Sequence, residues 1–171
     1  MAYAVDSNGF IQANNQYYGM DFCPAYWDWL LTNYHAGLVI SIDRVYSEIQ
    51  AHQDSLANWV SGPASGLFLP SADAATIACY QQVLTWVQQR RTPEGQQFYK
   101  NAVLNNFFGG GADPYLIAYA MAHNHTVVTL ESSDQQRRNK VLIPVVCGGL
   151  GVPCITLFDM LRIEQAKFVL E

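Results

Sequence analysis

Four carboxylates lie at or near the places where a strand pattern ends or a helical pattern begins. Asp6 and Glu131 each follow a short β-prone run, Asp113 stands directly before a proline that opens an apolar helical pattern, and Glu48 lies in the second turn of an expected helix. A set of side chains that offers only carboxylate oxygens suits a hard divalent cation such as Mg²⁺ or Mn²⁺. These four acids are therefore our candidates for catalytic and metal-ligating residues.

Alternating strand and helix patterns predict how the acids are positioned. β-rich or apolar runs too short for helices occur at residues 3–5, 38–42, 67–69, 126–130 and 141–146. Helical spacing and start signals occur at residues 22–34, 43–52, 71–91, 93–107, 113–121 and 157–169, with Asp21, Asp113 and Thr156 as expected N-caps. This alternation predicts an α/β fold in which helices cover both faces of a parallel sheet of about five strands.

In such a sheet, strand ends and the starts of the following helices share one edge, where ligands bind. The four acids should therefore converge. Only nine Lys and Arg residues are available in the whole chain, and Arg44 is the one that stands close to these positions, so ion pairs cannot easily neutralise all four. Taken singly, Asp113 also fits an ordinary helix cap, Glu48 a surface acid and Glu131 a loop acid.

Length and composition favour one packed domain spanning residues 1–171. Half of the residues are apolar and 13% are charged, which is unlike a disordered chain. The net charge of -5 argues against a broad basic face for nucleic acid. A bound divalent cation can reverse the sign of the charge locally, so an acidic protein can still act on a phosphodiester.

The compartment is expected to be the cytoplasm, with no membrane helix. The N-terminus has no basic segment typical of a secretory signal, and prolines and glycines interrupt the longest uncharged run, residues 141–158. The four cysteines form no CxxC pair, as expected for reduced thiols. A zinc site would have to be assembled from residues that lack close ligand spacing: Cys147, Cys154, His123 and His125.

Three short motifs resemble those of the PIN-domain ribonuclease superfamily, including its VapC-like toxins. Val5-Asp6-Ser7-Asn8 looks like the first motif, Val45-Tyr46-Ser47-Glu48 is similar to the second, and Ala112-Asp113-Pro114-Tyr115-Leu116 looks like the start of the third. The fourth PIN acid usually follows a strand in a Thr-x-Asp pattern. Here Thr129-Leu130-Glu131 stands in its place, and Asp134 competes with Glu131 for that role.

The match runs in order along nearly the whole chain, which resembles a bacterial PIN-like subfamily long left as a domain of unknown function. The resemblance implies a three-layer PIN-like fold and an Mg²⁺- or Mn²⁺-dependent endoribonuclease, the toxin of a toxin–antitoxin pair. It also implies an RNA substrate, a homodimer and an antitoxin partner. The chemistry would be hydrolysis of a phosphodiester by water activated at the metal.

Other side chains are expected to support this chemistry. Ser7 and Asn8 would orient Asp6 or contact phosphate, while Arg137 and Arg138, with Lys140, either hold RNA phosphates or lie in a solvated loop. Three residues off the apolar stripe of the helix at 22–34 are expected at a dimer or antitoxin surface: Trp27, Leu31 and Tyr34.

Two other functions compete with this interpretation. A phosphatase of the haloacid-dehalogenase type also uses an Asp after its first strand, but it needs a second Asp two residues later, where this chain has Asn8. A non-catalytic module with the PIN fold that binds a partner protein is the stronger alternative, and the replaced Thr-x-Asp pattern favours it.

Overall fold

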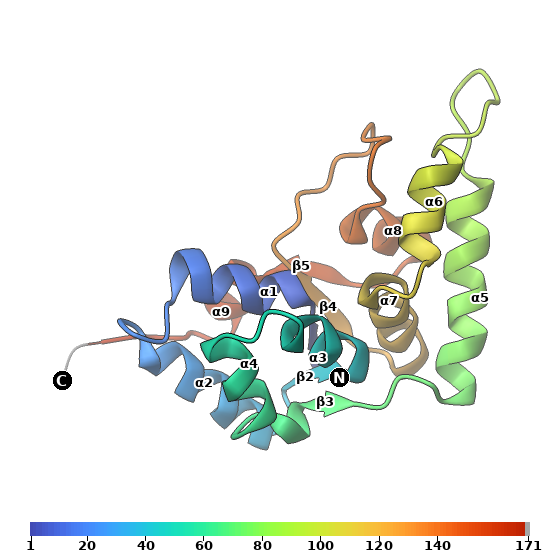
Figure 1. Cartoon of the computed structure of the whole chain (residues 1–171). Coiled ribbons are helices and arrows are strands. Elements are labelled where there is room, and N and C mark those ends of the chain that lie inside the picture. Colours follow the sequence, from blue (N-terminus) through green and yellow to red (C-terminus); the bar gives the residue numbers. More distant parts are fainter. Residues whose placement is uncertain (170–171) are drawn as a thin grey trace.

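A parallel sheet organises the molecule (Figure 1). The computed structural model describes residues 1–169. Within them the sheet has five strands in the order β3-β2-β1-β4-β5, and every neighbouring pair is parallel. The strands are β1 (Tyr3–Val5), β2 (Val39–Ile42), β3 (Phe68–Leu69), β4 (Thr126–Thr129) and β5 (Cys154–Thr156).

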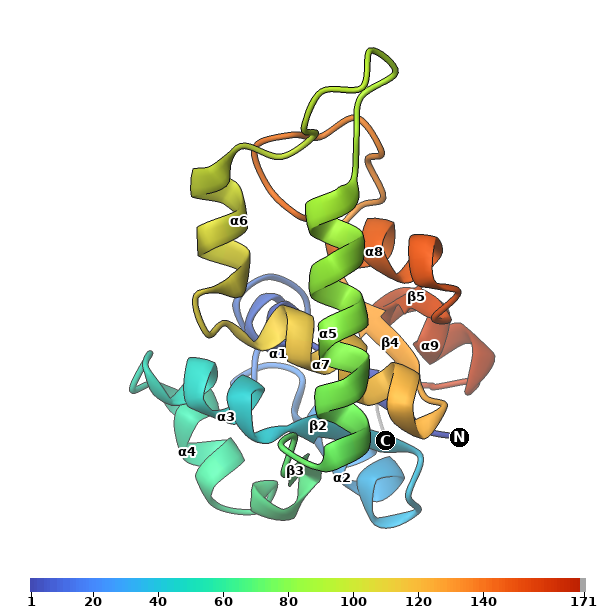
Figure 2. The same cartoon turned by 90° about the vertical axis from the view of Figure 1, so that its right-hand side faces the viewer.

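Helices cover both faces of the sheet. α7 contacts β2 and β4, α8 contacts β4 and β5, and α5 packs along the outside of α7, whereas α2 and α9 lie on the other side (Figures 1 and 2). The helices are α1 (Ser7–Gln12), α2 (Pro24–His35), α3 (Asp43–Gln50), α4 (Ser55–Ser61), α5 (Ala74–Gln89), α6 (Asn101–Phe108), α7 (Ala112–His123), α8 (Ile143–Leu150) and α9 (Leu157–Ile163). A π-helical turn (Ala13–Tyr17) and a 3₁₀ turn (Ser65–Leu67) complete the elements. The expected α/β class with a parallel sheet is confirmed.

The register of the two central strands sets the position of the acids. Val5 pairs with Val128, and the backbone N–H of Asp6 continues the ladder by donating to the carbonyl of Val128 at 3.0 Å. β1 and β4 therefore end side by side, and Asp6 lies next to Thr129. Both strands are made of buried residues except the half-buried Tyr3, as expected for the middle of a covered parallel sheet.

The fifth strand is not where we expected it. Residues 141–146 are β-branched and apolar, but Ile143–Leu150 forms helix α8, and the edge strand is Cys154–Thr156. Pro144 stands in the first turn of α8, where its missing N–H costs nothing. The same proline would have removed a ladder hydrogen bond from a strand, so it was the local signal against one.

The helix expected to start at Pro93 is also wrong. Residues 92–100 form a loop instead, and α6 begins only at Asn101. Thr92-Pro93-Glu94-Gly95 is a β-turn in which the Gly95 N–H donates to the Thr92 carbonyl at 2.9 Å. Proline at the second position and glycine at the fourth are typical of such a turn.

Other helices begin or end at residues different from those that the sequence predicts. Asp21 does not cap α2, which starts at Pro24 after Cys23. α1 begins directly after Asp6, which is its N-cap. Asp113 is the second residue of α7, whose N-cap position is Gly111. Thr156 does cap α9, through a capping box with Asp159, although α9 ends at Ile163 rather than near residue 169.

Trp27 does not belong to an exposed surface. Its side chain is buried, and its indole N–H donates to the Tyr18 carbonyl at 2.7 Å. Leu31 and Tyr34 are half-buried. The prediction that Trp27 lies at a dimer or antitoxin surface is therefore wrong. No helix within residues 1–169 is long and apolar enough to span a membrane.

Two adjacent glycines of α8 provide a matched test of its packing. A Cβ at Gly149 would lie 2.0 Å from the ring of Trp86 on α5, whereas a Cβ at Gly148 would meet nothing within 4 Å. We expect Gly149→Ala to lower the free energy of unfolding by about 1–3 kcal/mol through overpacking. Gly148→Ala should raise it by about 0.5–1 kcal/mol, because alanine loses less backbone entropy in a helix. Urea unfolding of both variants measures this. Equal effects of the two substitutions would contradict the α5–α8 packing.

Candidate active site

Asp6 is buried at the end of β1, where α1 begins. Its carboxylate accepts two hydrogen bonds, one at Oδ1 from the backbone N–H of Gly9 (2.6 Å) and one at Oδ2 from the hydroxyl of Thr129 (2.7 Å). It is thus the N-cap of α1 and is tied to the end of β4. A Cβ at Gly9 would approach Val5 to 2.7 Å, so glycine allows α1 to turn this tightly against β1.

Glu48 links three helices. It projects from α3, and its Oε2 accepts a hydrogen bond from the hydroxyl of Ser7 in α1 at 2.6 Å. Its Oε1 accepts from the backbone N–H of Ala112, the first residue of α7, at 2.8 Å. The carboxylate of Glu48 therefore caps the N-terminus of α7, because Gly111 at the N-cap position has no side chain that could do so.

Glu131 is held in a similar way at the start of α8. Its Oε2 accepts a hydrogen bond from the backbone N–H of Ile143 at 2.8 Å, and its Oε1 forms an ion pair with the ammonium of Lys140. The backbone N–H of Glu131 donates to the hydroxyl of Thr129 at 3.1 Å, which connects Glu131 to the residue that binds Asp6. Asp134, the competing fourth acid, is exposed in the following loop, where it accepts from the N–H of Gln136.

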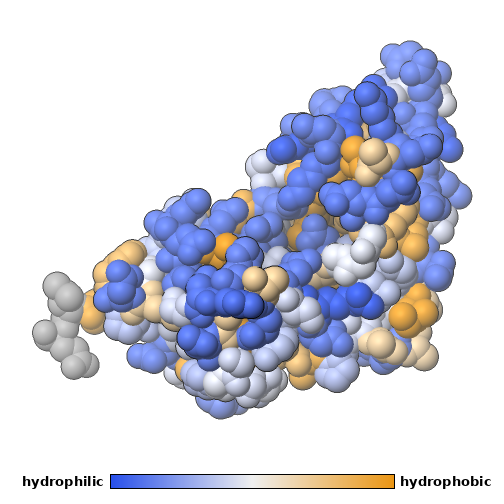
Figure 3. All heavy atoms as spheres, in the orientation of Figure 1, coloured by the Kyte–Doolittle hydropathy of each residue, from blue (hydrophilic) through white to orange (hydrophobic). Residues whose placement is uncertain are grey.

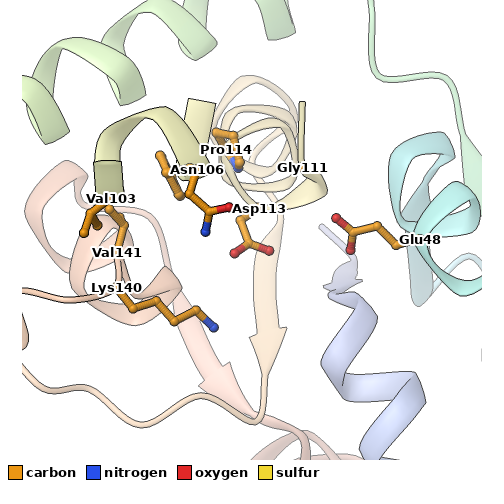
Figure 4. A pocket seen from close by; sticks show the side chains of 9 residues that line it. Glu48, Val103, Asn106, Gly111, Asp113, Pro114, Lys140 and Val141 are labelled. Atoms are coloured by element: carbon orange, nitrogen blue, oxygen red, sulfur yellow. The ribbon is translucent and has the colours of Figure 1, made fainter. Parts of the chain in front are cut away.

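Asp113 differs from the other three acids. It is half-buried in the first turn of α7, and its carboxylate accepts no hydrogen bond from any residue in the range 1–169 that the structure describes. It lines a cavity of about 200 Å³ whose wall includes Glu48, Lys140 and Asn106. In Figure 4 the carboxylates of Asp113 and Glu48 lie on opposite sides of this cavity, and the ammonium of Lys140 points into it from below.

Burial and mutual repulsion raise the pKa of two of the acids, Asp6 and Asp113. Burial raises the pKa of Asp6 from 3.8 to about 7, and the charges of Asp113 and Glu131 add to this against the two hydrogen bonds that lower it. Burial also raises the pKa of Asp113 to about 6, with the charges of Glu131 and Glu48 adding to it and Lys140 opposing. These shifts indicate that the acids interact electrostatically as one group.

This set of donors suits Mg²⁺ or Mn²⁺ when water or phosphate completes the coordination shell. Within residues 1–169, no three His, Cys, Asp or Glu side chains are gathered closely enough to enclose a metal ion. Mg²⁺, however, is commonly held by one or two carboxylates, with waters and phosphate oxygens completing its shell. Asp113, whose carboxylate accepts no hydrogen bond from residues 1–169, and Glu48 across the cavity provide that minimum. The donor chemistry therefore suits a divalent cation that is bound together with water or phosphate.

The expected substrate-binding residues lie in different surroundings. Ser7 is buried and positions Glu48, while Asn8 is half-buried beside Asp6 in α1. Arg137 is exposed, and its guanidinium donates only to Asn139 among the described residues. Arg138 donates to the backbone carbonyls of Phe98 (2.9 Å) and Gln97 (3.2 Å), and so ties two loops together. Contact of any of these residues with a substrate stays a prediction.

Sequence reasoning missed two features of the site. Asn106 of α6 lies on the cavity wall, and nothing in the local sequence marked it beyond its position shortly before the glycine run at 109–111. Lys140 was considered only as a loop residue for RNA phosphates, but it enters the acidic site itself. Its charge next to Glu131 depends on the path of the loop at 131–140, which a motif does not specify.

One known protein family matches nearly the whole chain. Residues 3–168 match the family described as Domain of unknown function (DUF4411). The chain belongs to that family. A comparison with curated proteins finds no match.

The fold of this family member is similar to that of a solved chain described as "Crystal structure of VapBC2 from Rickettsia felis bound to a DNA fragment from their promoter". The TM-score is 0.53 at 16% identity, and the alignment covers 91% of this chain and 98% of the other. At this identity the likeness concerns the fold alone. The expected PIN-like α/β fold is confirmed.

The raised pKa values of Asp6 and Asp113 predict how stability depends on pH. Between the ordinary pKa of 3.8 and the folded values of about 6 and about 7, the folded protein binds more protons than the unfolded chain. Stability should therefore fall as pH rises through this window when no metal is present. Asp6→Asn, which can keep the cap to Gly9, should flatten the profile and melt no lower than wild type at about pH 7.5.

Thermal and urea unfolding in EDTA across this pH range measure the effect. The matched control is Asp28→Asn, an exposed position on α2, which should follow the wild-type profile. If Asp6→Asn instead loses several degrees at every pH, Asp6 acts as a structural carboxylate whose charge the fold requires.

Proposed function

We propose that this protein is an Mg²⁺- or Mn²⁺-dependent endoribonuclease that acts as the toxin of a toxin–antitoxin pair. The observation that carries the proposal is the meeting of Asp6, Glu48, Asp113 and Glu131 at the edge where the parallel strands end, with the carboxylate of Asp113 unpartnered among residues 1–169. The PIN-like motifs that contain these acids support the same assignment.

Each residue has a role that its contacts suggest. Asp113, Glu48 and Asp6 would hold the cation, directly or through water, with Ser7 and Thr129 fixing the carboxylates of Glu48 and Asp6. When bound, the cation would make water more acidic and neutralise charge on the phosphate undergoing attack. Hydrolysis would add water at phosphorus and break one P–O bond of the RNA backbone, and the leaving oxygen would take up a proton.

Glu131 and Lys140 would act together in this reaction. Because the carboxylate of Glu131 is paired with the ammonium of Lys140, its contribution is to hold Lys140 at the cavity and to serve as an outer acid of the site. The ammonium of Lys140 would contact a non-bridging phosphate oxygen and stabilise the charge that develops there.

The partners belong to the same proposal. The similarity to a chain of the VapBC2 complex supports an antitoxin encoded nearby, and the PIN-like resemblance supports a homodimer working in a bacterial cytoplasm. The single-domain organisation over residues 1–171 is part of this proposal as well. A zinc centre has less support: His123 is engaged by Asp73 at 3.1 Å.

A non-catalytic interaction module is the second candidate. The ion pair between Glu131 and Lys140 favours it, because the ammonium already neutralises the charge that a fourth ligand would offer to a cation. The two candidates differ in one property. A nuclease must bind Mn²⁺ at the carboxylates, whereas a module that only recognises a partner has no need of the ion.

Metal dependence tests the nuclease directly. We expect cleavage of RNA with Mg²⁺ or Mn²⁺ and none with excess EDTA. Asp113→Asn should reduce the cleavage rate by about a hundredfold or more, because it removes charge from the carboxylate that no hydrogen bond from the described residues occupies. It should also abolish most of the rise in melting temperature that Mn²⁺ gives to wild type. Asp28→Asn is the control for charge and should change neither result. Cleavage that persists in EDTA would rule out the metal-dependent mechanism.

Lys140→Met separates phosphate binding from metal binding. We expect a fall in kcat/KM of roughly tenfold to a hundredfold, because one stabilising cation is lost. Mn²⁺ should bind at least as tightly as to wild type, because a competing positive charge leaves the neighbourhood of Asp113. Kinetics and calorimetric Mn²⁺ titration measure the two quantities, and Lys140→Arg should recover part of the rate. Loss of Mn²⁺ binding in Lys140→Met would show that Lys140 only supports the fold of the site.

A further inference from the structure

The positive charges of this acidic protein are concentrated in two loops. Residues 90–100 and 131–140 contain six of the nine Lys and Arg residues but three of the fourteen acids, which gives these loops a net charge of +3. The remainder has three cations and eleven acids, a net charge of -8. The six cations are Arg90, Arg91, Lys100, Arg137, Arg138 and Lys140. We call these two loops the basic platform.

The two loops form one unit although about 40 residues separate them in sequence. Arg90 donates to the carbonyl of Gln135 at 2.6 Å, and Arg138 donates to the carbonyls of Phe98 and Gln97. Both views show them side by side at the end of the molecule beyond α5 and α6 (Figures 1 and 2). Figure 3 shows that hydrophilic residues cover most of this end. Arg90 and Arg138 thus hold the platform together, and Arg91, Lys100 and Arg137 remain on its surface.

The cations available to a ligand lie at exposed positions. Arg91, Lys100 and Arg137 are exposed, and the ammonium of Lys100 donates no hydrogen bond to the described residues. The aromatic rings of the platform are covered: Phe98 and Tyr99 are buried, and the guanidinium of Arg90 lies 4.1 Å from the Phe98 ring centroid. The surface therefore offers charge for phosphates but no free ring on which a base can stack.

The platform leads directly into the acidic cavity. Lys140 ends one loop and lines the cavity, where its ammonium meets Glu131. The other loop ends at Lys100, the residue before α6, and Val103, Asn106 and Phe107 of α6 form another part of the cavity wall. A polyanion lying on the exposed cations would therefore have one of its charges close to Asp113 and Glu48.

We propose that the basic platform binds the phosphate backbone of RNA, without choosing its sequence, and places one phosphate at the carboxylate cavity. The inference rests on the proposed nuclease function and adds the surface that recognises its substrate. A polynucleotide fits better than an isolated anion, because the positive charges are spread over two loops rather than gathered around one pocket. RNA binding at the platform does not itself require the metal.

The test measures binding of a fluorescently labelled single-stranded RNA in EDTA, where no cleavage is expected. The variant Lys100→Gln/Arg137→Gln removes two exposed charges of the platform. The matched control Arg162→Gln/Lys167→Gln removes two exposed charges from α9 and the segment after it, at the opposite end of the molecule (Figure 1). Circular dichroism and urea unfolding check that both variants fold.

We expect the platform variant to bind RNA about tenfold more weakly or worse at low salt. The slope of log affinity against log salt should fall in magnitude by about 1.4, because each phosphate contact on a single strand contributes about 0.7. The control should bind as wild type does. RNAs of different sequence should lose affinity equally. Equal loss in both variants, or no loss in either, would overturn the proposal.

Two further outcomes separate this inference from its alternatives. If platform-dependent RNA binding occurs in EDTA but no metal supports cleavage, the nuclease function fails while the binding surface stands. If cleavage occurs but both variants bind and cleave as wild type does, the binding surface fails while the nuclease stands. Poly-glutamate is the second probe. Tighter platform-dependent binding of poly-glutamate than of RNA would overturn the proposal in favour of an acidic protein partner.

Discussion

The structure depends on carboxylates that accept hydrogen bonds from the first backbone N–H groups of helices. Asp6 accepts from Gly9 at the start of α1, Glu48 from Ala112 at the start of α7, and Glu131 from Ile143 at the start of α8. Helix N-termini carry unpaired N–H groups and a partial positive charge, so each of these bonds stabilises both the acid and the helix. α1 follows β1, and α7 precedes β4 in the chain. Both helices therefore begin at the edge of the sheet where the neighbouring strands β1 and β4 end. The fold and the site thus share the same hydrogen bonds.

This arrangement explains how much of the site the sequence could predict. Asp6 follows β1, Glu48 lies in the helix after β2, and Asp113 opens a helix, so their convergence requires only that the strands be parallel. The hydrophobic runs and the turn residues predict those elements well. The predicted order of strands and helices was therefore sufficient to bring the acids together, even though Asp113 proved to be inside α7 and not at its N-cap.

The details that could not be predicted depend on contacts between distant segments. The run at 141–146 has β-branched residues typical of a strand. Pro144 was the local signal against a strand, and packing of α8 against α5 and α7 favours the helix that forms there. The pairing of Lys140 with Glu131 depends on how the loop between β4 and α8 is folded. That loop is in turn held by Arg90 and Arg138, whose partners lie about 40 residues away in the chain. No motif at Glu131 encodes these bonds.

The distribution of charge connects the site to the surface around it. Hydrogen bonds from helix N-termini satisfy carboxylate oxygens but leave the net charge in place, and Lys140 alone cannot balance four acids. Burial and repulsion therefore raise the pKa of Asp6 and Asp113, and a cation of the kind proposed here would relieve the repulsion between these carboxylates. An RNA strand would be repelled by the rest of this acidic molecule. The basic platform places favourable charge beside the cavity. A polyanion attracted there would meet carboxylates whose charge the proposed cation would locally reverse.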